Sequence, residues 1–289
     1  MPRRQPLALA VWPSLAEKKR ACYTFFVSTK PPARATASRN RVAMKMDIAG
    51  EETAPEDFLR KAMGARTARS RAAYARRGLA TSGPLDRTTH AMLLRQLYLS
   101  LYEGRRFEQA HAIALQALEL DVLADVLNQD AARAALASGD LESALSHLRA
   151  ASRRGPASRR PFHLWTLGGT LFLAQRYAEA AAALSRAARW GTKDKPLYRA
   201  HLALAMLASG EKVDDLQSTI DDLAEAPCGQ GYGRFVLGHL AYAAGEWVAA
   251  KRYREAFLKR TTAARPALGI ALEGEVRMTR ATLAKMSAN

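Results

Sequence analysis

A pattern that returns about every 35 residues constrains the fold of this chain more strongly than any other feature of its sequence. In four of the five copies, a glycine or polar turn residue precedes an aromatic residue or leucine, and an anchor position follows three residues later; in the fourth copy, Gly210 and Glu211 lead to the anchor. The anchors are Ala110, Ala144, Ala180, Asp215 and Ala250, which lie 34, 36, 35 and 35 residues apart. A period of this length is typical of stacked helix-turn-helix units.

Apolar residues around each anchor indicate that two helices form in every unit. The first helix carries leucines at helical spacing, as Leu94, Leu97 and Leu101 do in the first unit. The second helix carries alanine at the anchor and again seven residues later, as at Ala144 and Ala151. Small residues let two helix backbones approach closely. The sequence therefore predicts five helix pairs over about residues 91–260.

The third unit is the clearest copy of the pattern. Its characteristic residues are Leu164, Leu167, Gly168, Leu171, Tyr177, Ala180, Leu184 and Ala187. In residue type and spacing it resembles the tetratricopeptide repeat (TPR), and the second unit resembles it through Gly139, Ala144, Ala151 and Pro156. The resemblance implies an all-α, TPR-type helical solenoid of about five repeats.

The fourth unit departs from this pattern. Polar side chains occupy three positions of its second helix that are usually small or apolar, namely Asp215, Thr219 and Asp222. We expect this helix to be rotated or shifted, so that its inward-facing residues are Val213, Leu216, Ile220 and Leu223.

The chain divides into three segments. Residues 1–54 lack apolar periodicity and are predicted to be a disordered basic arm, with Met44 or Met46 as an alternative natural start that would leave residues 1–43 outside the protein. Residues 55–84 are predicted to form a basic helix and a linker. Residues 85–289 are predicted to form the solenoid and a capping helix that opens near Pro266. The apolar face of that helix is Leu268, Leu272, Val276, Leu283 and Met286.

The resemblance also implies a binding surface, because the exposed faces of the first helices in TPR proteins line a concave groove for a peptide or helix. It places ten residues of this chain there: Arg95, Tyr102, Gln129, Arg133, Trp165, Phe172, His201, Phe235, His239 and Tyr242. Aromatic and arginine side chains commonly anchor protein interfaces. The alternative is that Trp165 and Phe172 pack between repeats as ordinary core. The Lys/Asn set with which some TPR proteins clamp a terminal carboxylate is not matched.

Patterns for catalysis and cofactor binding are missing from the sequence. The six histidines form no metal-ligand motif, and neither a nucleophile elbow nor a phosphate-binding loop occurs. We therefore expect a non-catalytic protein without a cofactor or a metal. Cys22 and Cys228 are too few for a disulfide framework, which favours a reducing, cytoplasmic location. No apolar stretch reaches the roughly 20 residues that cross a bilayer.

Positive charge is concentrated in the first third of the chain. Residues 1–90 hold 18 Lys and Arg against 7 Asp and Glu, whereas residues 91–289 hold 26 against 20. This asymmetry suggests an acidic partner, such as nucleic acid, for the arm, and a solvated tail is the alternative. A basic run, Arg153, Arg154, Arg159 and Arg160, is expected either to grip an acidic segment or to be a solvated turn.

Two functions follow from these features. The first is a protein–protein interaction adaptor or scaffold that binds a peptide or amphipathic helix in the TPR groove. The alternative is a nucleic-acid-associated regulator that uses the basic arm.

Overall fold

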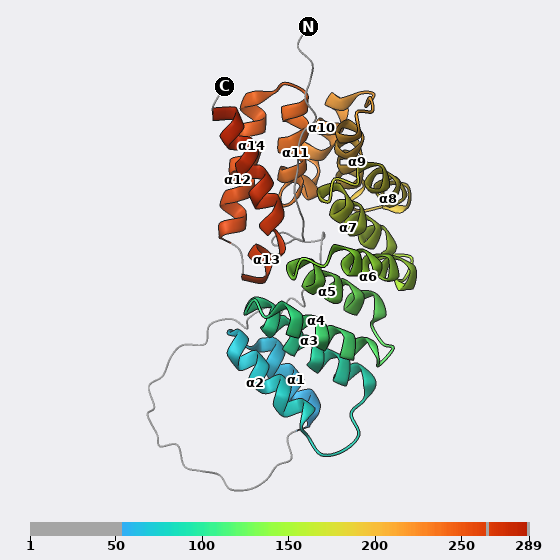
Figure 1. Cartoon of the computed structure of the whole chain (residues 1–289), viewed down its shortest axis with the longest axis vertical. Helices are drawn as coiled ribbons and strands as arrows, with labels where there is room; N and C mark the ends of the chain where they lie inside the picture. Colours follow the sequence, from blue (N-terminus) through green and yellow to red (C-terminus); the bar gives the residue numbers. More distant parts are fainter. Residues whose placement is uncertain (1–53, 264–265, 288–289) are drawn as a thin grey trace.

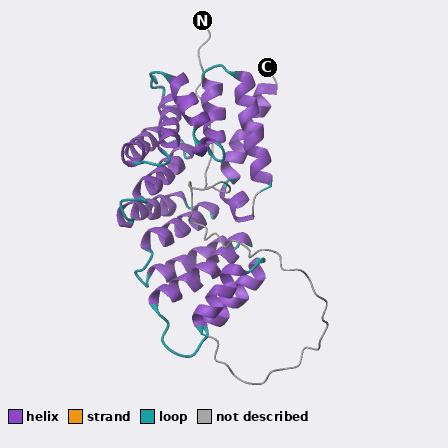
Figure 2. Cartoon of the chain, turned by 180° about the vertical axis from the view of Figure 1, so that it is seen from behind, coloured by secondary structure: helices purple, strands orange, loops and turns teal. Residues whose placement is uncertain are grey.

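The computed structural model of the protein describes residues 54–263 and 266–287, and all regular structure in these residues is helical (Figure 2). The predicted disordered arm lies outside the described residues, except for its last residue. No described helix combines the length and the apolar character that crossing a bilayer requires. The α-helices are α1 (Pro55–Gly64), α2 (Ala68–Leu79), α3 (Arg87–Glu103), α4 (Phe107–Leu118), α5 (Ala124–Ala137), α6 (Leu141–Arg154), α7 (Arg160–Leu173), α8 (Tyr177–Trp190), α9 (Lys195–Ser209), α10 (Leu216–Glu225), α11 (Gly233–Ala243), α12 (Trp247–Thr262), α13 (Pro266–Ala271) and α14 (Glu273–Ser287), and a short 3-10 helix, η1 (Pro227–Gly229), precedes α11.

Helices α3 to α12 form five helix pairs that stack in chain order (Figure 1). The two helices of each pair contact each other, and the second helix of each pair contacts the first helix of the next. Because neighbours in sequence are neighbours in space, the stack has the architecture of a helical solenoid. The prediction of an all-α solenoid of five units is confirmed.

The turn inside each pair is made at the same place in every unit. One residue there has a positive φ: Arg105 (56°), Gly139 (87°), Gln175 (61°), Gly210 (86°) and Gly245 (84°). Glycine adopts this conformation freely, whereas a residue with a Cβ is strained in it. The sequence pattern places the first turn at Gly104, but Gly104 keeps a φ of −82° and Arg105 makes the turn instead.

Small residues sit where the two helices of a pair cross. The four alanine anchors, Ala110, Ala144, Ala180 and Ala250, are fully buried. A Cβ added to Gly168 would lie 2.6 Å from Cγ of Leu184 and 3.2 Å from the carbonyl oxygen of Ala180. These contacts confirm the repeat register that the sequence predicts.

The rotation predicted for the second helix of the fourth unit is also observed. Asp215 caps α10 by accepting a hydrogen bond from the backbone N–H of Ser218 at 3.2 Å. Ile220 and Leu223 are buried, and Val213 and Leu216 pack against the core from partly buried positions. The polar residues of this unit therefore face outward.

Residues 55–79 form two helices, not the single basic helix that the sequence predicts. The chain breaks after Gly64, and Thr67 caps α2 by accepting a hydrogen bond from the backbone N–H of Ser70. Buried Phe58, Ala62 and Ala75 attach the pair to α3, as a further helix pair before the first repeat. The arginine-rich composition hides this break, because the residues of α2 that become buried are only alanine and glycine.

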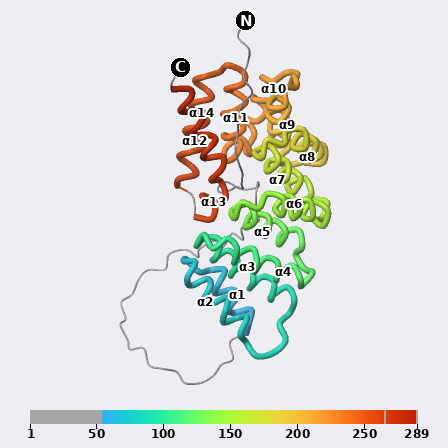
Figure 3. The backbone as a smooth tube through the Cα atoms, viewed as in Figure 1, coloured from blue at the N-terminus to red at the C-terminus, as the bar shows by residue number. Residues whose placement is uncertain are grey.

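The C-terminal segment also differs from the predicted cap. It forms two helices, and α13 packs on α3 and α5 while α14 packs on α12 (Figure 3). Val276, Leu283 and Met286 are only partly buried, whereas Glu275 and Thr279 are completely buried. The prediction failed because it assigned the inward face from apolar residues alone. The chain thus returns to its first repeat and closes the solenoid.

Candidate protein-binding surface

The first helices of the five units form a continuous inner layer. Helix α3 contacts α5, and α9 contacts both α7 and α11. His163 of α7 donates a hydrogen bond to Asp125 and accepts one from Gln129, which completes the series between α5 and α7. A surface built from these helices would therefore extend along the whole solenoid.

Aromatic side chains form a cluster in the later part of this layer. The ring of Trp165 lies 5.1 Å from that of Tyr232 at a near-perpendicular angle of 83°. The Trp165 indole N–H donates a hydrogen bond to Nδ1 of His201 at 3.1 Å. Phe235 contacts Tyr232 in a tilted arrangement, with ring centroids 5.4 Å apart, and Phe172 meets His201 edge to face at the same distance. Edge-to-face contacts of this kind stabilise a core beyond the area they bury.

Burial corrects the sequence-based assignment of the groove. Trp165, Phe172, His201 and Phe235 have no exposed surface, so they are core residues, which was the alternative for the first two. Among the ten predicted residues, only Arg133, whose side chain is 18% exposed, and Tyr242 are half-buried, and the other eight are buried. The prediction failed because it treated the first helices as lying at a free surface. In the structure, other parts of the chain cover these side chains.

Two of the predicted arginines are engaged within the chain. Nε of Arg95 lies 2.5 Å from Asp130 Oδ2, and Nη1 of Arg133 lies 3.0 Å from the other oxygen of the same carboxylate. The sequence analysis did not identify Asp130 as the partner of Arg95, although the two residues lie 35 positions apart, which is one repeat length. Part of the Arg133 side chain stays exposed to solvent, whereas Arg95 mainly joins α3 to α5.

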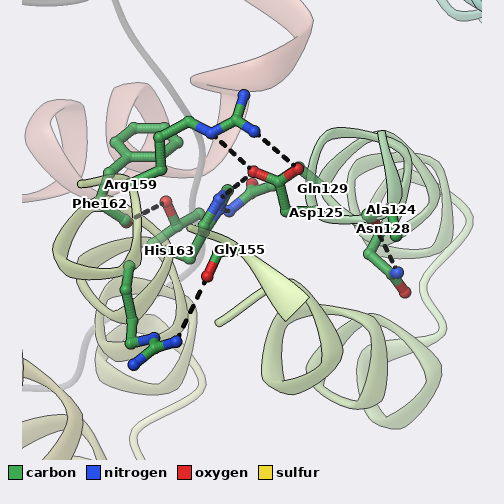
Figure 4. Close-up of polar contacts among 10 residues, drawn as sticks. Ala124, Asp125, Asn128, Gln129, Gly155, Arg159, Phe162 and His163 are labelled. Atoms are coloured by element: carbon green, nitrogen blue, oxygen red, sulfur yellow. Dashed lines mark hydrogen bonds and ion pairs between the residues drawn. The ribbon is translucent and has the colours of Figure 1, made fainter. Parts of the chain in front are cut away.

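Another predicted polar residue, Gln129, belongs to a buried network between α5 and α7 (Figure 4). His163 donates a hydrogen bond from Nε2 to Asp125 at 2.9 Å and accepts one at Nδ1 from the Gln129 amide at 2.9 Å. Arg159 adds an ion pair to Asp125 at 3.0 Å. Burial disfavours the charge on Asp125, but the hydrogen bond from His163, together with the charge of Arg159, outweighs it and holds the carboxyl pKa below its ordinary value.

An aspartate–histidine pair is also the core of many catalytic bases, so its surroundings matter. Here the second ring nitrogen of His163 faces the amide of Gln129, and no hydroxyl or thiol stands in the place of a nucleophile. Asp125 and His163 are only 3% and 2% exposed. This network therefore ties two repeats together. In the part of the chain that the structure describes, no three His, Cys, Asp or Glu side chains come together as metal ligands.

The predicted basic run meets acidic groups of its own chain. Arg154 pairs with Asp121 and Arg159 with Asp125, both in or just before α5. Arg160 donates to the carbonyl of Gly155 at 3.5 Å. The acidic segment that this run was expected to grip is therefore the preceding repeat.

The sequence analysis did not identify the most informative part of the inner layer, where another helix is already bound. Buried Ala267, Ile270 and Ala271 of α13 belong to one apolar cluster with Tyr98 and Tyr102 of α3 and with Ala131 and Ala134 of α5. The two tyrosine rings are stacked, with centroids 5.8 Å apart and planes inclined by 22°. We call this surface of α3 and α5 the helix seat.

No family model matches the chain, and a comparison with curated proteins also finds no match.

Proposed function

We propose that the protein is a TPR-type, non-catalytic adaptor that binds a helical segment of another protein on the inner layer of first helices. The helix seat is the observation that supports this proposal most directly, because the surface already holds an apolar helix of the same chain. Stacked aromatic rings beside small residues provide a flat apolar surface, and aromatic anchors contribute strongly to protein interfaces. The two cysteines in the whole sequence favour a cytoplasmic location.

Site-specific photo-cross-linking tests the binding face. A benzoylphenylalanine placed at the half-buried Tyr242 on α11 should cross-link a partner in a lysate, whereas the same group at exposed Leu115 on α4 should not. Mass spectrometry then identifies the partner and the cross-linked segment, which we expect to be helical. Specific cross-links from Leu115 but none from Tyr242 would show that the partner binds elsewhere.

A nucleic-acid-associated regulator is the second candidate, supported by three exposed arginines, Arg66, Arg69 and Arg76, on and beside α2. Two other arginines of α2 are engaged within the chain: Arg71 pairs with Glu103 at 2.7 Å, and the Arg77 guanidinium lies 4.9 Å from the Phe58 ring centroid.

Glutamine at Arg66, Arg69 and Arg76 should weaken duplex binding in a salt-dependent manner, since each phosphate contact steepens the salt slope by about one. Electrophoretic mobility shift across salt concentrations measures this slope. An unchanged slope would remove this candidate.

A further inference from the structure

The contact between α13 and the helix seat joins parts of the chain that are far apart in sequence. Beside it, Arg105 Nη2 lies 2.6 Å from Glu273 Oε1, across 168 residues. At the other end of α14, buried Arg254 donates to the sulfur of Met286 at 3.1 Å. Helices α13 and α14 therefore span from the first repeat to the last, and we call them the latch.

The latch is held by features that favour reversible docking. Helix α13 has only six residues, far fewer than a helix needs to be stable by itself. The Arg105–Glu273 ion pair is more than half exposed on both sides, and such pairs contribute little. The apolar contacts on the seat therefore supply most of the attraction for α13.

Two buried polar groups on α14 oppose docking. Glu275 has no exposed surface, with only its own backbone N–H and the Tyr232 hydroxyl beside its carboxyl group, and the hydroxyl of fully buried Thr279, one turn later, is unsatisfied. Burial raises the pKa of Glu275 well above its ordinary value, and the nearby Tyr232 hydroxyl offsets only part of that rise. Undocking would return both groups to water, where their hydrogen bonds are satisfied.

The latch residues on the seat have a definite spacing. Ala267, Ile270 and Ala271 stand at positions i, i+3 and i+4, which share one face of a helix, and acidic Glu273 follows two residues later beside Arg105. A partner helix with the same pattern would meet the same tyrosines, alanines and arginine.

We propose that α13–α14 is an intramolecular latch, and that the seat on α3 and α5 can receive a partner's amphipathic helix in its place. That helix carries a small residue at position i, an apolar residue at i+3, a small residue at i+4 and an acidic residue at i+6. This inference rests on the proposed function for the partner, but the latch can be tested without one.

The test uses a fluorescein-labelled synthetic peptide with the sequence of residues 266–287, and its binding to the full-length chain is followed by fluorescence anisotropy. Replacing Ile270 and Met278, one buried residue in each latch helix, by aspartate should detach the latch in cis. The peptide should then bind at least about tenfold more tightly than it binds the wild-type chain.

A variant with the opposite expectation gives the matched control. A Cβ added to Gly269 of α13 would meet no atom within 4 Å, so Gly269→Ala should favour the helix without a clash. It should weaken peptide binding by about two- to fivefold, since alanine is the better helix former. Equal peptide affinity for wild type, the double aspartate variant and Gly269→Ala would overturn the latch.

If the double aspartate variant loses its helical circular dichroism, a charge exchange decides the question. Glu273→Arg in the chain should tighten binding of the peptide, which keeps its own Glu273, by about two- to fivefold, and adding Arg105→Glu should remove that gain. A Glu273→Arg chain with wild-type affinity contradicts the latch.

The two proposals can fail separately. Peptide binding that follows these variants, together with cross-links only from Leu115, would support the latch while refuting the proposed binding face. A partner that cross-links at Tyr242 equally in all variants would refute the latch and leave the adaptor function standing.

Discussion

Two buried histidines on the inner layer make the stability of the fold sensitive to acid. His201 has no exposed surface, and burial lowers its pKa to about 3. Burial, followed by the charge of Arg254, also lowers the pKa of His239 well below its ordinary value. Both rings are therefore neutral in the folded chain at neutral pH, while an unfolded histidine takes up a proton near pH 6.5.

His201→Gln should make the chain less sensitive to acid. Between about pH 6.5 and 3 the unfolded state binds a proton that folded His201 rejects, so each pH unit lowers the free energy of unfolding by about 1.4 kcal/mol. Glutamine cannot titrate, and its oxygen can still accept the Trp165 hydrogen bond. Melting temperatures from pH 7 to 4 measure the slope, with the half-buried His90→Gln as control. A slope equal to that of the wild type would contradict this assignment.

Glu275→Gln should have its largest effect at the other end of the pH range. The folded pKa of Glu275 is raised, so ionisation adds no further cost to its burial below about pH 4.3, where both states are protonated. Above that value the unfolded state ionises first, and the wild type loses about 1.4 kcal/mol per pH unit until the folded pKa is passed. The variant should therefore gain stability over the wild type as pH rises from 5 to 8. A constant difference in melting temperature across that range would show that Glu275 is not the group responsible.

At the scale of the element, the turn inside each helix pair sets the repeat. Its positive φ recurs at the same position in all five units, with glycine in three of them and Arg105 or Gln175 in the others. The backbone, and not a particular side chain, therefore defines the turn.

Alanine substitutions in two neighbouring turns should separate conformation from packing. Gly139→Ala should cost about 1–2 kcal/mol, because φ is 87° there although no atom obstructs a Cβ. Gly104→Ala should cost less, because φ is −82° and a Cβ would approach only backbone carbonyls at 3.4 Å. Urea denaturation measures both. Equal losses would mean that the positive φ carries no strain.

The sequence predicts these elements well because their signals are local. The anchors at Ala110 and Ala180, and the inward face of Ile220 and Leu223, depend only on periodicity within one unit. The candidate site is predicted poorly, because burial of Trp165 and Phe235 depends on what covers them. Aspartate at either position should unfold the chain, so such a variant cannot test binding. Glu275 is a similar case, since a glutamate in the sequence gives no sign that it lies inside.

At the scale of the whole molecule, closure by α13 alters the energetics expected of a solenoid. An open stack has only nearest-neighbour contacts, so its ends unfold before its middle. Here the first repeat contacts α13, and α14 contacts α12. Opening of one end therefore also removes contacts from the other.

Native-state hydrogen exchange should detect this coupling. In the wild type, the slowest-exchanging amides of α4 and α12 should share an opening free energy to within about 0.5 kcal/mol, as members of one cooperative unit do. In the variant with aspartate at Ile270 and Met278, the two values should separate. Distinct values in the wild type would show that the two ends open independently.

Contact between α13 and α3 also fixes the number of helix pairs that the molecule can contain. Deleting or duplicating one helix pair in an open stack changes its length and leaves the neighbouring contacts intact. In this chain the same change would move α12 by one unit relative to α3, and α13 would no longer reach Tyr98 and Tyr102. The contact between α13 and α3 therefore requires five repeats. Unlike an open solenoid, this chain cannot gain or lose a whole repeat without losing that contact.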